Sequence, residues 1–335
     1  MPETAVAILN WNGAELLRRF LPSVLQHSRE ARVYVIDNAS TDSSVEVLKN
    51  EFPEVVIIQN DGNYGYAGGY NQGLKSIPEE YVVLLNSDVE VNENWLQPLV
   101  KRLNDQPELG ALQPKILDLK RPEYFEYAGA AGGWLDNLGY PFCRGRIFDE
   151  LEKDQGQYNE YQELFWATGA CMMVRQSAYS QAGGLDESLF AHMEEIDLCW
   201  RMHLRGFKVA CEPASVVYHL GGGTLNKISP QKTYLNFRNS LIILFLNLPQ
   251  WEAFTKILQR LVLDGVAGIK FLLEGKVSHL WAIIRAHFAF YSRFNALARK
   301  KMGQPVQKMK DLPGVYPQSI VKSFYLGGKK KFTEL

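Results

Sequence analysis

The sequence predicts an α/β fold, with a mostly parallel sheet flanked by helices and a helical extension towards the carboxyl end. Short β-branched runs alternate with helical patterns through the first 115 residues, which is the order of βαβ units. Two long stretches of apolar residues at helical spacing follow residue 250. The 335 residues, 46% hydrophobic and 22% charged, allow a sizeable core and exclude a disordered or collagen-like chain.

The first half alternates regularly between strands and helices. Short apolar runs predict four strands at 6–9, 33–36, 55–59 and 81–85, with helices between them at 14–26, 43–50 and 67–76. Ligands of parallel sheets lie at the carboxyl ends of the strands. We therefore expect a binding site in the polar segments that follow them, residues 10–13, 37–42, 60–69 and 86–90.

The second half is less regular. Residues 117–163 show no period and indicate an irregular excursion, whereas the apolar run 164–174 predicts a strand broken at Gly169. Helices are expected at 177–181 and 194–205, short strands at 209–210 and 215–218, and helices beyond Pro230. The resulting division is a domain of residues 1–240, with halves 1–115 and 116–240, and a basic helical region 241–335.

Charge is unevenly distributed along the chain. Residues 251–335 hold 15 Lys and Arg against 5 Asp and Glu, a net of +10, and the rest holds 21 against 32, a net of −11. The overall net charge of −1 argues against a nucleic-acid partner. The basic, apolar-striped helices suggest peripheral contact with the cytoplasmic face of a membrane. Packing on the rest of the chain, or on a second copy in a homodimer, is the equally open alternative.

The cysteines and the amino-terminal segment indicate a cytoplasmic protein. Cys143, Cys171, Cys199 and Cys211 form no C-x-x-C pattern, which favours reduced thiols. The first residues lack the basic segment and long apolar stretch of a signal peptide. The longest strongly apolar run, 241–248, is far below the roughly 20 residues that span a bilayer, so no transmembrane helix is expected.

A carboxylate follows the fourth predicted strand. Asn86, Ser87 and Asp88 would stand in the crevice, where one or two carboxylates and substrate phosphates suit Mg²⁺ or Mn²⁺. An ordinary Asx turn is the alternative. His219, after a later strand, is either a metal ligand or a core imidazole with its hydrogen bonds satisfied.

The loops after the second and third strands suggest a nucleotide. Asp37 ends a strand, and its carboxylate would accept hydrogen bonds from a ribose or a pyrimidine imide; alternatively Thr41 or Asp42 only caps the next helix. The Gly-rich segment 61–73 has no G-x-G-x-x-G at a strand end, which excludes a dinucleotide site. It predicts a tight loop that enters a helix whose N–H groups approach a phosphate.

Three acidic residues, Glu194, Glu195 and Asp197, open a predicted helix. One interpretation is that their negative charges interact favourably with the positive end of the helix dipole. The other is that they repel one another, and that this repulsion raises the pKa of at least one of them, which suits a general base. The sequence contains no HExxH, G-x-S-x-G or Walker loop, which excludes proteases, serine hydrolases and P-loop NTPases.

Eight segments, taken in order, resemble the bacterial family 2 glycosyltransferases of GT-A fold, particularly their rhamnosyltransferase-like branch. They are AILNWNG, VIDNASTDSS, N-x-GYAGGYNQG, LLNSDVEV, ATGACMMVR, GGLDE, F-x-x-x-EEIDLCWR and VYH. The resemblance covers about residues 5–239. As a set in family order the segments are highly specific, because separate turns and caps do not explain their joint occurrence.

The resemblance implies roles for residues along the whole match. The polar loops of the first half would hold the nucleoside and line the donor: Asn10, Asn12, Asp37, Asn38, Asp42, Asn63, Gly68 and Asn71. Asn86, Ser87 and Asp88 match the D-x-D-type metal motif, with Asp88 as the main carboxylate ligand of Mg²⁺ or Mn²⁺ and His219 assisting.

The acceptor half is matched in the same way. Glu194 and Glu195 match a Glu-Asp pair whose second member is the catalytic base, with Glu in place of the usual Asp; Glu194 and Asp197 are the alternatives. The acceptor-side framework would be formed by Gly169, Ala170, Gly184, Leu185 and Asp186. The segment with Tyr234, Arg238 and Asn239 resembles a Y-x-x-x-R-N end of the catalytic domain, to which no role is assigned.

The function implied is an inverting transfer of a sugar from a nucleoside-diphosphate sugar to a hydroxyl of a glycan or lipid-linked acceptor in cell-surface polysaccharide synthesis. The branch resemblance suggests dTDP-rhamnose or a UDP-sugar as donor. One alternative is a non-catalytic sugar-nucleotide or polysaccharide-binding module on the same fold. Another is a glycoside hydrolase, which needs paired carboxylates but no diphosphate-and-metal site.

Overall fold

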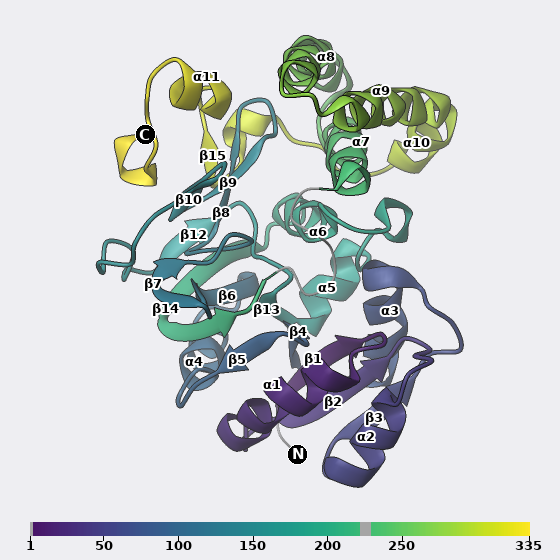
Figure 1. Ribbon diagram of the computed structural model, residues 1–335, viewed down its shortest axis with the longest axis vertical. Coiled ribbons are helices and arrows are strands. Elements are labelled where there is room, and N and C mark those ends of the chain that lie inside the picture. The colour runs from purple at the N-terminus through teal and green to yellow at the C-terminus, as the bar shows by residue number, and fades with distance from the viewer. Residues whose placement is uncertain (1–2, 222–228) are drawn as a thin grey trace.

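A large mixed sheet flanked by helices forms the body of the computed structural model, which describes residues 3–221 and 229–335 (Figure 1). The main path through its ten strands runs β12-β14-β6-β13-β4-β1-β2-β3, while β5 pairs with β14 and β7 with β6. The strands are β1 (Thr4–Asn10), β2 (Arg32–Asp37), β3 (Val56–Gln59), β4 (Tyr81–Asn86), β5 (Val89–Val91), β6 (Leu109–Asp118), β7 (Arg121–Phe125), β12 (Gln162–Leu164), β13 (Cys171–Arg175) and β14 (Lys208–His219).

The first half is a parallel sheet, as expected. Strands β3, β2, β1 and β4 are parallel neighbours, and Asn10 lies beside Asp37 while Leu9 lies beside Asn86. The carboxyl ends of these strands therefore share one edge. The connecting helices are α1 (Ala14–His27), α2 (Ser44–Glu51), α3 (Gly65–Gly73), its 3₁₀ continuation η1 (Leu74–Ser76) and α4 (Gln97–Asp105). Apolar side chains of α1 and α4 cover one face of the sheet, and those of α3 the other.

The second half adds antiparallel strands to β4. Strand β13 pairs antiparallel with β4 and β6, and helices α5 (Gln176–Ala182), η2 (Glu187–Leu189) and α6 (Glu194–His203) follow it. The strand expected at 164–174 is broken, as predicted at Gly169, but the break is longer than expected. Strand β12 ends at Leu164 and β13 begins at Cys171, because residues 165–170 cross from β14 to β4. The two strands expected at 209–210 and 215–218 are one strand, β14, with a register shift between Glu212 and Val216.

A second, smaller sheet occupies much of the region that we expected to be irregular. Its order is β11-β10-β9-β8-β15, and its strands are β8 (Gly133–Asp136), β9 (Pro141–Cys143), β10 (Arg146–Ile147), β11 (Glu150–Leu151) and β15 (Val315–Tyr316). Because β15 pairs with β8, the carboxyl-terminal segment returns to the body of the protein. The rings of Phe142, Tyr316 and Phe332 pack together there.

The carboxyl-terminal helices form a layer beside α6 (Figure 1). They are α7 (Pro230–Asn247), α8 (Gln250–Leu273), α9 (Val277–Ser292) and α10 (Phe294–Lys301), followed by η3 (Met309–Asp311), α11 (Ile320–Tyr325) and η4 (Phe332–Glu334). Helix α7 contacts α6, α8, α9 and α10 and runs through residue 240 without a break. Among the helices of the described residues, none combines the length and apolar content required to cross a membrane.

Candidate active site

Asn10 and Asp37 meet at the carboxyl ends of β1 and β2. The Asn10 amide donates to Asp37 Oδ1 at 3.1 Å and to Ser40 Oγ at 3.2 Å, and Asp37 Oδ2 accepts from the Ser40 N–H at 3.1 Å. Both side chains are buried. Asn10 Oδ1 accepts no hydrogen bond from the described residues, which leaves a buried acceptor at this edge of the sheet.

Asn12 and Asp42 tie the loops after β1 and β2 together. Asn12 has a left-handed backbone (φ 51°), and its Oδ1 accepts from the Thr41 N–H at 2.7 Å. Asp42 accepts from the N–H groups of Ala14 and Ser44, at the first residues of α1 and α2. Burial acts to raise the pKa of Asp42, but these hydrogen bonds outweigh it and lower the pKa. Asp42 thus accepts from the first N–H of α2, although the N-cap residue of that helix is Ser43.

Asn38 fixes the Gly-rich loop. Its amide donates to Asn63 Oδ1 and to the Gly65 carbonyl, both at 3.0 Å, and its Oδ1 accepts from the Tyr64 N–H at 3.2 Å. At Gly68 a Cβ would lie 2.7 Å from the Cβ of Tyr64, so glycine allows α3 to approach this loop. The structure therefore brings Asn38, Asn63 and Gly68 together beside the Asn10 and Asp37 pair.

Asn71 faces a different neighbour. Its Nδ2 donates to the Leu185 carbonyl at 2.9 Å, and its Oδ1 accepts from the Leu185 N–H at 3.0 Å and from the Tyr179 hydroxyl at 2.6 Å. Asn71 thus joins α3 to the loop that contains Gly184, Leu185 and Asp186, and its expected place beside the donor stays a prediction.

Asp88 and His219 form a buried polar centre at the ends of β4 and β14. Asp88 Oδ1 lies 3.0 Å from His219 Nε2, and Glu126 Oε1 lies 3.3 Å from His219 Nδ1. Burial acts to lower the pKa of His219, but its hydrogen bonds to the two carboxylates raise the pKa to about 10. His219 is therefore a buried imidazole with a carboxylate beside each ring nitrogen, an arrangement that both the metal-ligand role and the hydrogen-bonded core role allow.

The donor set of this centre fits a divalent cation. The Asp88 carboxylate, in the turn between β4 and β5, lies beside the His219 imidazole at the end of β14, and both side chains are buried. Within residues 3–221 and 229–335, no group of three or more His, Cys, Asp and Glu side chains is arranged as a complete metal site. Mg²⁺ and Mn²⁺ in phosphate-transferring sites are commonly held by few protein ligands together with phosphate oxygens. Asp88 and His219 match that kind of site.

Glu194 and Glu195 lie in the first turn of α6, where they are largely shielded from solvent. Glu194 is buried and Glu195 partly buried, and the Oε2 atom of each accepts no hydrogen bond from the described part of the chain. Burial and the charge of Glu195 raise the pKa of Glu194 well above its ordinary value. Burial also raises the pKa of Glu195, but Lys232 and backbone N–H groups oppose that rise. Both carboxyls therefore have raised pKa values, and the positive charge of Lys232 favours the ionised form of Glu195.

Tyr66, in the Gly-rich helix α3, is hydrogen-bonded to the segment that precedes β13. Its hydroxyl donates to the Gly169 carbonyl at 2.8 Å, and the Ala170 carbonyl accepts from the Asn86 N–H at 3.0 Å. Burial is the largest cause that raises the pKa of Tyr66 well above its ordinary value, and the charges of Tyr70, Glu194 and Glu195 add to the rise. Gly169 and Ala170 therefore contact Tyr66 and the end of β4 at Asn86.

The loop before α6 is strained and is held by α7. Phe190, His192 and Met193 have φ angles of 68°, 68° and 73°, a conformation uncommon for residues with a Cβ. Asn239 Nδ2 donates to the carbonyls of Leu189, Ala191 and His192 at 3.0, 2.9 and 2.7 Å. Arg238 donates to the Leu189 carbonyl and to Asn239 Oδ1, both at 2.8 Å. The Y-x-x-x-R-N segment, to which the sequence assigned no role, thus supplies the hydrogen bonds that hold the loop before α6.

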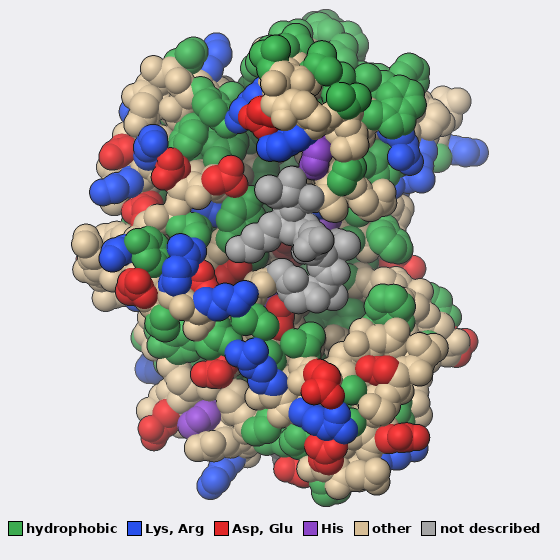
Figure 2. Space-filling view, in the orientation of Figure 1, with side chains coloured by type: hydrophobic (Ala, Val, Ile, Leu, Met, Phe, Trp, Pro, Cys, Tyr) green, Lys and Arg blue, Asp and Glu red, His purple; other side chains and the backbone are tan. Residues whose placement is uncertain are grey.

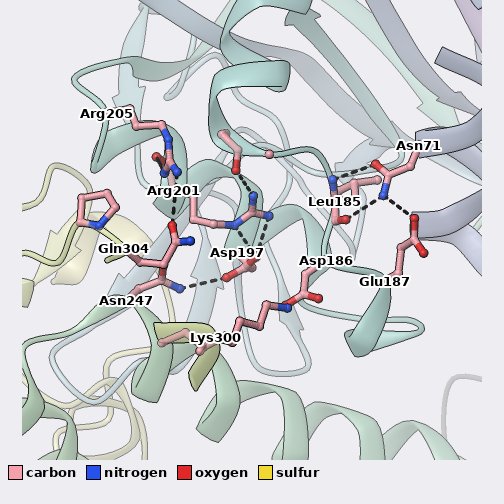
Figure 3. Close-up of a pocket in the computed structure, with 14 residues that line it drawn as sticks. Asn71, Leu185, Asp186, Glu187, Asp197, Arg201, Arg205, Asn247, Lys300 and Gln304 are labelled. Atoms are coloured by element: carbon pink, nitrogen blue, oxygen red, sulfur yellow. Dashed lines mark hydrogen bonds and ion pairs between the residues drawn. The ribbon is translucent and has the colours of Figure 1, made fainter. Parts of the chain in front are cut away.

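Asp197 does not join the glutamate pair. Its Oδ2 is paired with Arg201 at 2.7 Å, and its Oδ1 accepts from Asn247 at 2.9 Å. It lines a cavity of about 330 Å³ in which Asp186 pairs with Lys300 at 2.5 Å (Figure 3). Both carboxylates have cationic partners there, so this geometry favours structural roles for Asp197 and Asp186.

Sequence analysis did not identify three residues near these groups: Glu126, Tyr66 and Lys232. Glu126 lies in the segment without a period, and nothing in its spacing indicates a partnership with His219. Tyr66 stands inside the Gly-rich motif, where an aromatic residue at a helix start was the available signal. Lys232, near Glu195, lies in the first turn of α7, which sequence analysis placed only by its helical pattern.

Comparisons with known proteins agree on one family and one fold. The sequence model described as "Glycosyl transferase family 2" matches residues 5–183, more than half of the chain. An N-acetylglucosaminyl-diphospho-decaprenol L-rhamnosyltransferase of Mycobacterium tuberculosis is 28% identical over 233 residues, which are 64% of this chain and 75% of that protein. The low-salt glycan biosynthesis hexosyltransferase Agl10 of Haloferax volcanii is 23% identical over 292 residues, 84% and 88% of the two chains. A crystal structure of GalNAc-T7 with UDP, GalNAc and Mn²⁺ has a TM-score of 0.58 at 18% identity, covering 74% of this chain and 48% of that one, and shows a shared fold.

Proposed function

Because the chain belongs to glycosyl transferase family 2 and has the GT-A fold, we propose that it is a metal-dependent, inverting glycosyltransferase. The family and the fold expected from the sequence motifs are thereby confirmed. The observation that carries the proposal is the buried pair Glu194 and Glu195, whose raised pKa values and unpaired oxygens suit proton transfer. The contacts that run from Tyr66 through Gly169 and Ala170 to Asn86, two residues before Asp88, support placing this pair and the centre formed by Asp88 and His219 in one site.

The donor would bind along the carboxyl edge of β1 and β2. We assign the nucleoside to Asn10 and Asp37, since Asn10 leaves a buried acceptor open and Asp37 lies beside it. Asn12, Asn38, Asp42 and Asn63 would hold the surrounding loops through the hydrogen bonds described above. A rhamnosyl or another hexosyl nucleotide is the donor class suggested by the relatives' names.

The reaction would be one in-line displacement. The acceptor hydroxyl oxygen forms a bond to the sugar C1 as the C1–O bond to the diphosphate breaks, and the nucleoside diphosphate leaves with the electron pair. Glu195 takes the hydroxyl proton, a task suited to a carboxylate whose pKa is raised. Asp88 and His219 would hold a divalent cation, Mg²⁺ or Mn²⁺, which neutralises charge on the leaving diphosphate. A single displacement inverts the configuration at C1.

The acceptor is proposed to be a hydroxyl on a glycan or a lipid-linked sugar. The Mycobacterium tuberculosis relative is named for a decaprenyl-diphosphate-linked acceptor, and such a lipid resides in a membrane. We therefore place the enzyme in the cytoplasm, working peripherally at the membrane surface.

A donor screen tests the proposed function. The full-length protein is incubated with a panel of nucleotide sugars, with and without Mn²⁺, with a polyprenyl-diphosphate-linked sugar as acceptor, and release of nucleoside diphosphate is measured. We expect release that depends on the cation and falls by about 10² or more in Glu195→Gln. Binding of a nucleotide sugar without any release, under every condition, would instead identify a binding module.

A further inference from the structure

Helix α8 buries an ion pair, Arg260 and Asp264, and exposes most of its large apolar side chains. Arg260 and Asp264 face inward, 2% and 0% exposed, and are paired at 3.2 Å. Their other partners come from other elements of the chain. Arg260 donates to Ser240 Oγ of α7 at 2.9 Å, Tyr140 donates to Asp264 at 2.9 Å, and His287 Nε2 of α9 lies 3.1 Å from Asp264. This network fixes the orientation of α8, since turning the helix would leave buried charges unpaired.

The outward face of α8 is consequently apolar from end to end. Nine large hydrophobic side chains on it are 43–83% exposed: Trp251, Phe254, Leu258, Leu261, Val262, Val266, Ile269, Leu272 and Leu273. Most of them recur three or four residues apart, and two pairs are adjacent in sequence, so together they form one broad stripe of the helix. In α9, Val277, Trp281 and Phe288 extend it, 58%, 59% and 71% exposed. Figure 2 shows hydrophobic side chains gathered over this end of the molecule. We call these twelve side chains the apolar platform.

An apolar stripe of this extent indicates a surface that another apolar body covers. The charges around the platform identify that body. Lys270, Lys276, Arg285 and Arg293 are exposed on or next to the same helices, and Glu274 is the exposed acid among them. Residues 250–293, which include α8 and α9, carry six Lys and Arg against three Asp and Glu, a net charge of +3. Two copies packed through this face would bring like charges together, whereas anionic headgroups complement them.

We propose that the apolar platform of α8 and α9 lies flat in the surface of an anionic lipid bilayer. Trp251 and Trp281 suit this position, because tryptophan favours the boundary between headgroups and acyl chains. Helix α7 packs against α8 and α9 on one side and contacts α6 on the other, so the platform is one helix layer from Glu195. That the bilayer is also where the acceptor lies rests on the proposed function. The membrane contact of the platform is inferred separately, from the exposed apolar face of the helices.

The test is flotation of the full-length protein with vesicles of phosphatidylcholine alone or mixed with phosphatidylglycerol. We expect binding to the anionic vesicles that weakens at high salt. The paired change Val262→Glu and Val266→Glu places two charges in the platform and should weaken vesicle binding by about tenfold or more. The matched control, Gln26→Glu and Gln97→Glu, adds the same charge to exposed positions of α1 and α4 at the other end of the long axis (Figure 1), and should leave vesicle binding within about twofold.

The readouts separate this proposal from the transferase proposal. Quenching of tryptophan fluorescence by brominated lipid should decrease in Trp281→Phe, since Trp281 would enter the bilayer. Nucleoside-diphosphate release with a soluble acceptor should be the same in the platform variant as in the wild type. If the platform variant binds vesicles as well as the wild type does, the proposed bilayer contact is wrong. It is also wrong if light scattering shows that the wild type is a dimer and that the platform variant is a monomer. If the wild-type protein binds anionic vesicles but turns over no nucleotide sugar, only the proposed transferase function is overturned.

Discussion

Asn239 on α7 is positioned to control Glu195 without touching it. Replacing it by alanine removes its hydrogen bonds to the carbonyls of Leu189, Ala191 and His192, at 3.0, 2.9 and 2.7 Å, and its contact with Arg238. At about 1 kcal/mol net for each hydrogen bond, the loss to stability is about 2 to 3 kcal/mol, since two hydrogens serve the three carbonyls.

That loss is comparable to the strain that the loop stores. Phe190, His192 and Met193 are left-handed, and such conformations cost about 1 to 3 kcal/mol each when nothing compensates them. Without Asn239 we expect the loop to relax and the first turn of α6 to shift with it. A displacement of about 1 Å of the catalytic base lowers a rate by about 10². Asn239→Ala should therefore lower kcat by about 10 to 10² and leave the KM for the donor nearly unchanged, because the donor residues lie on other loops.

The assay combines steady-state kinetics, a pH profile and urea unfolding. Ser240→Ala is the matched control, because it removes a buried hydrogen bond of the adjacent residue, to Arg260, and leaves the loop intact. In Asn239→Ala the acidic limb of kcat should move to lower pH, since a relaxed loop exposes Glu195 and removes part of the burial that raises its pKa. If both variants lose stability but keep wild-type kcat and the same acidic limb, Asn239 is a structural residue and our reasoning about the loop is wrong.

Four further outcomes follow from the site and the helix layer. Glu195→Gln should lower kcat by about 10² or more with little change in donor affinity, and more than Glu194→Gln does; the reverse ranking would move the base to Glu194. In the wild type the rate should fall as pH drops through the raised pKa of Glu195, because only the carboxylate accepts a proton, and a limb at an ordinary carboxyl pKa would contradict the desolvated site. A chelator should abolish turnover, and Asp88→Asn should raise the Mn²⁺ concentration needed for half-maximal rate by about tenfold; an unchanged requirement would remove Asp88 as a ligand. Asp264→Ala should lower the free energy of unfolding by about 3 to 5 kcal/mol in urea, because it leaves Arg260 buried without its partner, and a loss below about 1 kcal/mol would show that water or another group replaces the carboxylate.

The parallel half of the fold was predictable because its strands are buried on both faces. Strands β1, β2 and β4 therefore appear in the sequence as continuous apolar runs, and polar residues mark where each one ends. The position of Asn10 beside Asp37 follows from that arrangement, since parallel neighbours end at one edge. The same reasoning did not give the length of the break within residues 164–174, because an apolar run does not reveal where it leaves one strand and crosses to another.

Partners that are distant in sequence were beyond prediction. Strand β15 has two residues and pairs with β8, so neither carries a period long enough to recognise. Glu126 was missed for the same reason, since it follows β7 in a segment whose order depends on pairing with β6 and on contact with His219. In such segments tertiary contacts choose the structure, and the local sequence permits many.

Helix α8 shows why periodicity left two interpretations of the basic helices open. A helical stripe fixes which residues share a face but says nothing of which face turns inward. Arg260 and Asp264, four residues apart, would usually form an exposed ion pair on the polar side of a helix. Here Tyr140, Ser240 and His287 supply buried partners for that pair, so the polar side turns inward and the apolar side outward. The orientation depends on residues from three other segments of the chain, and it leaves the apolar side of α8 facing the surroundings of the molecule.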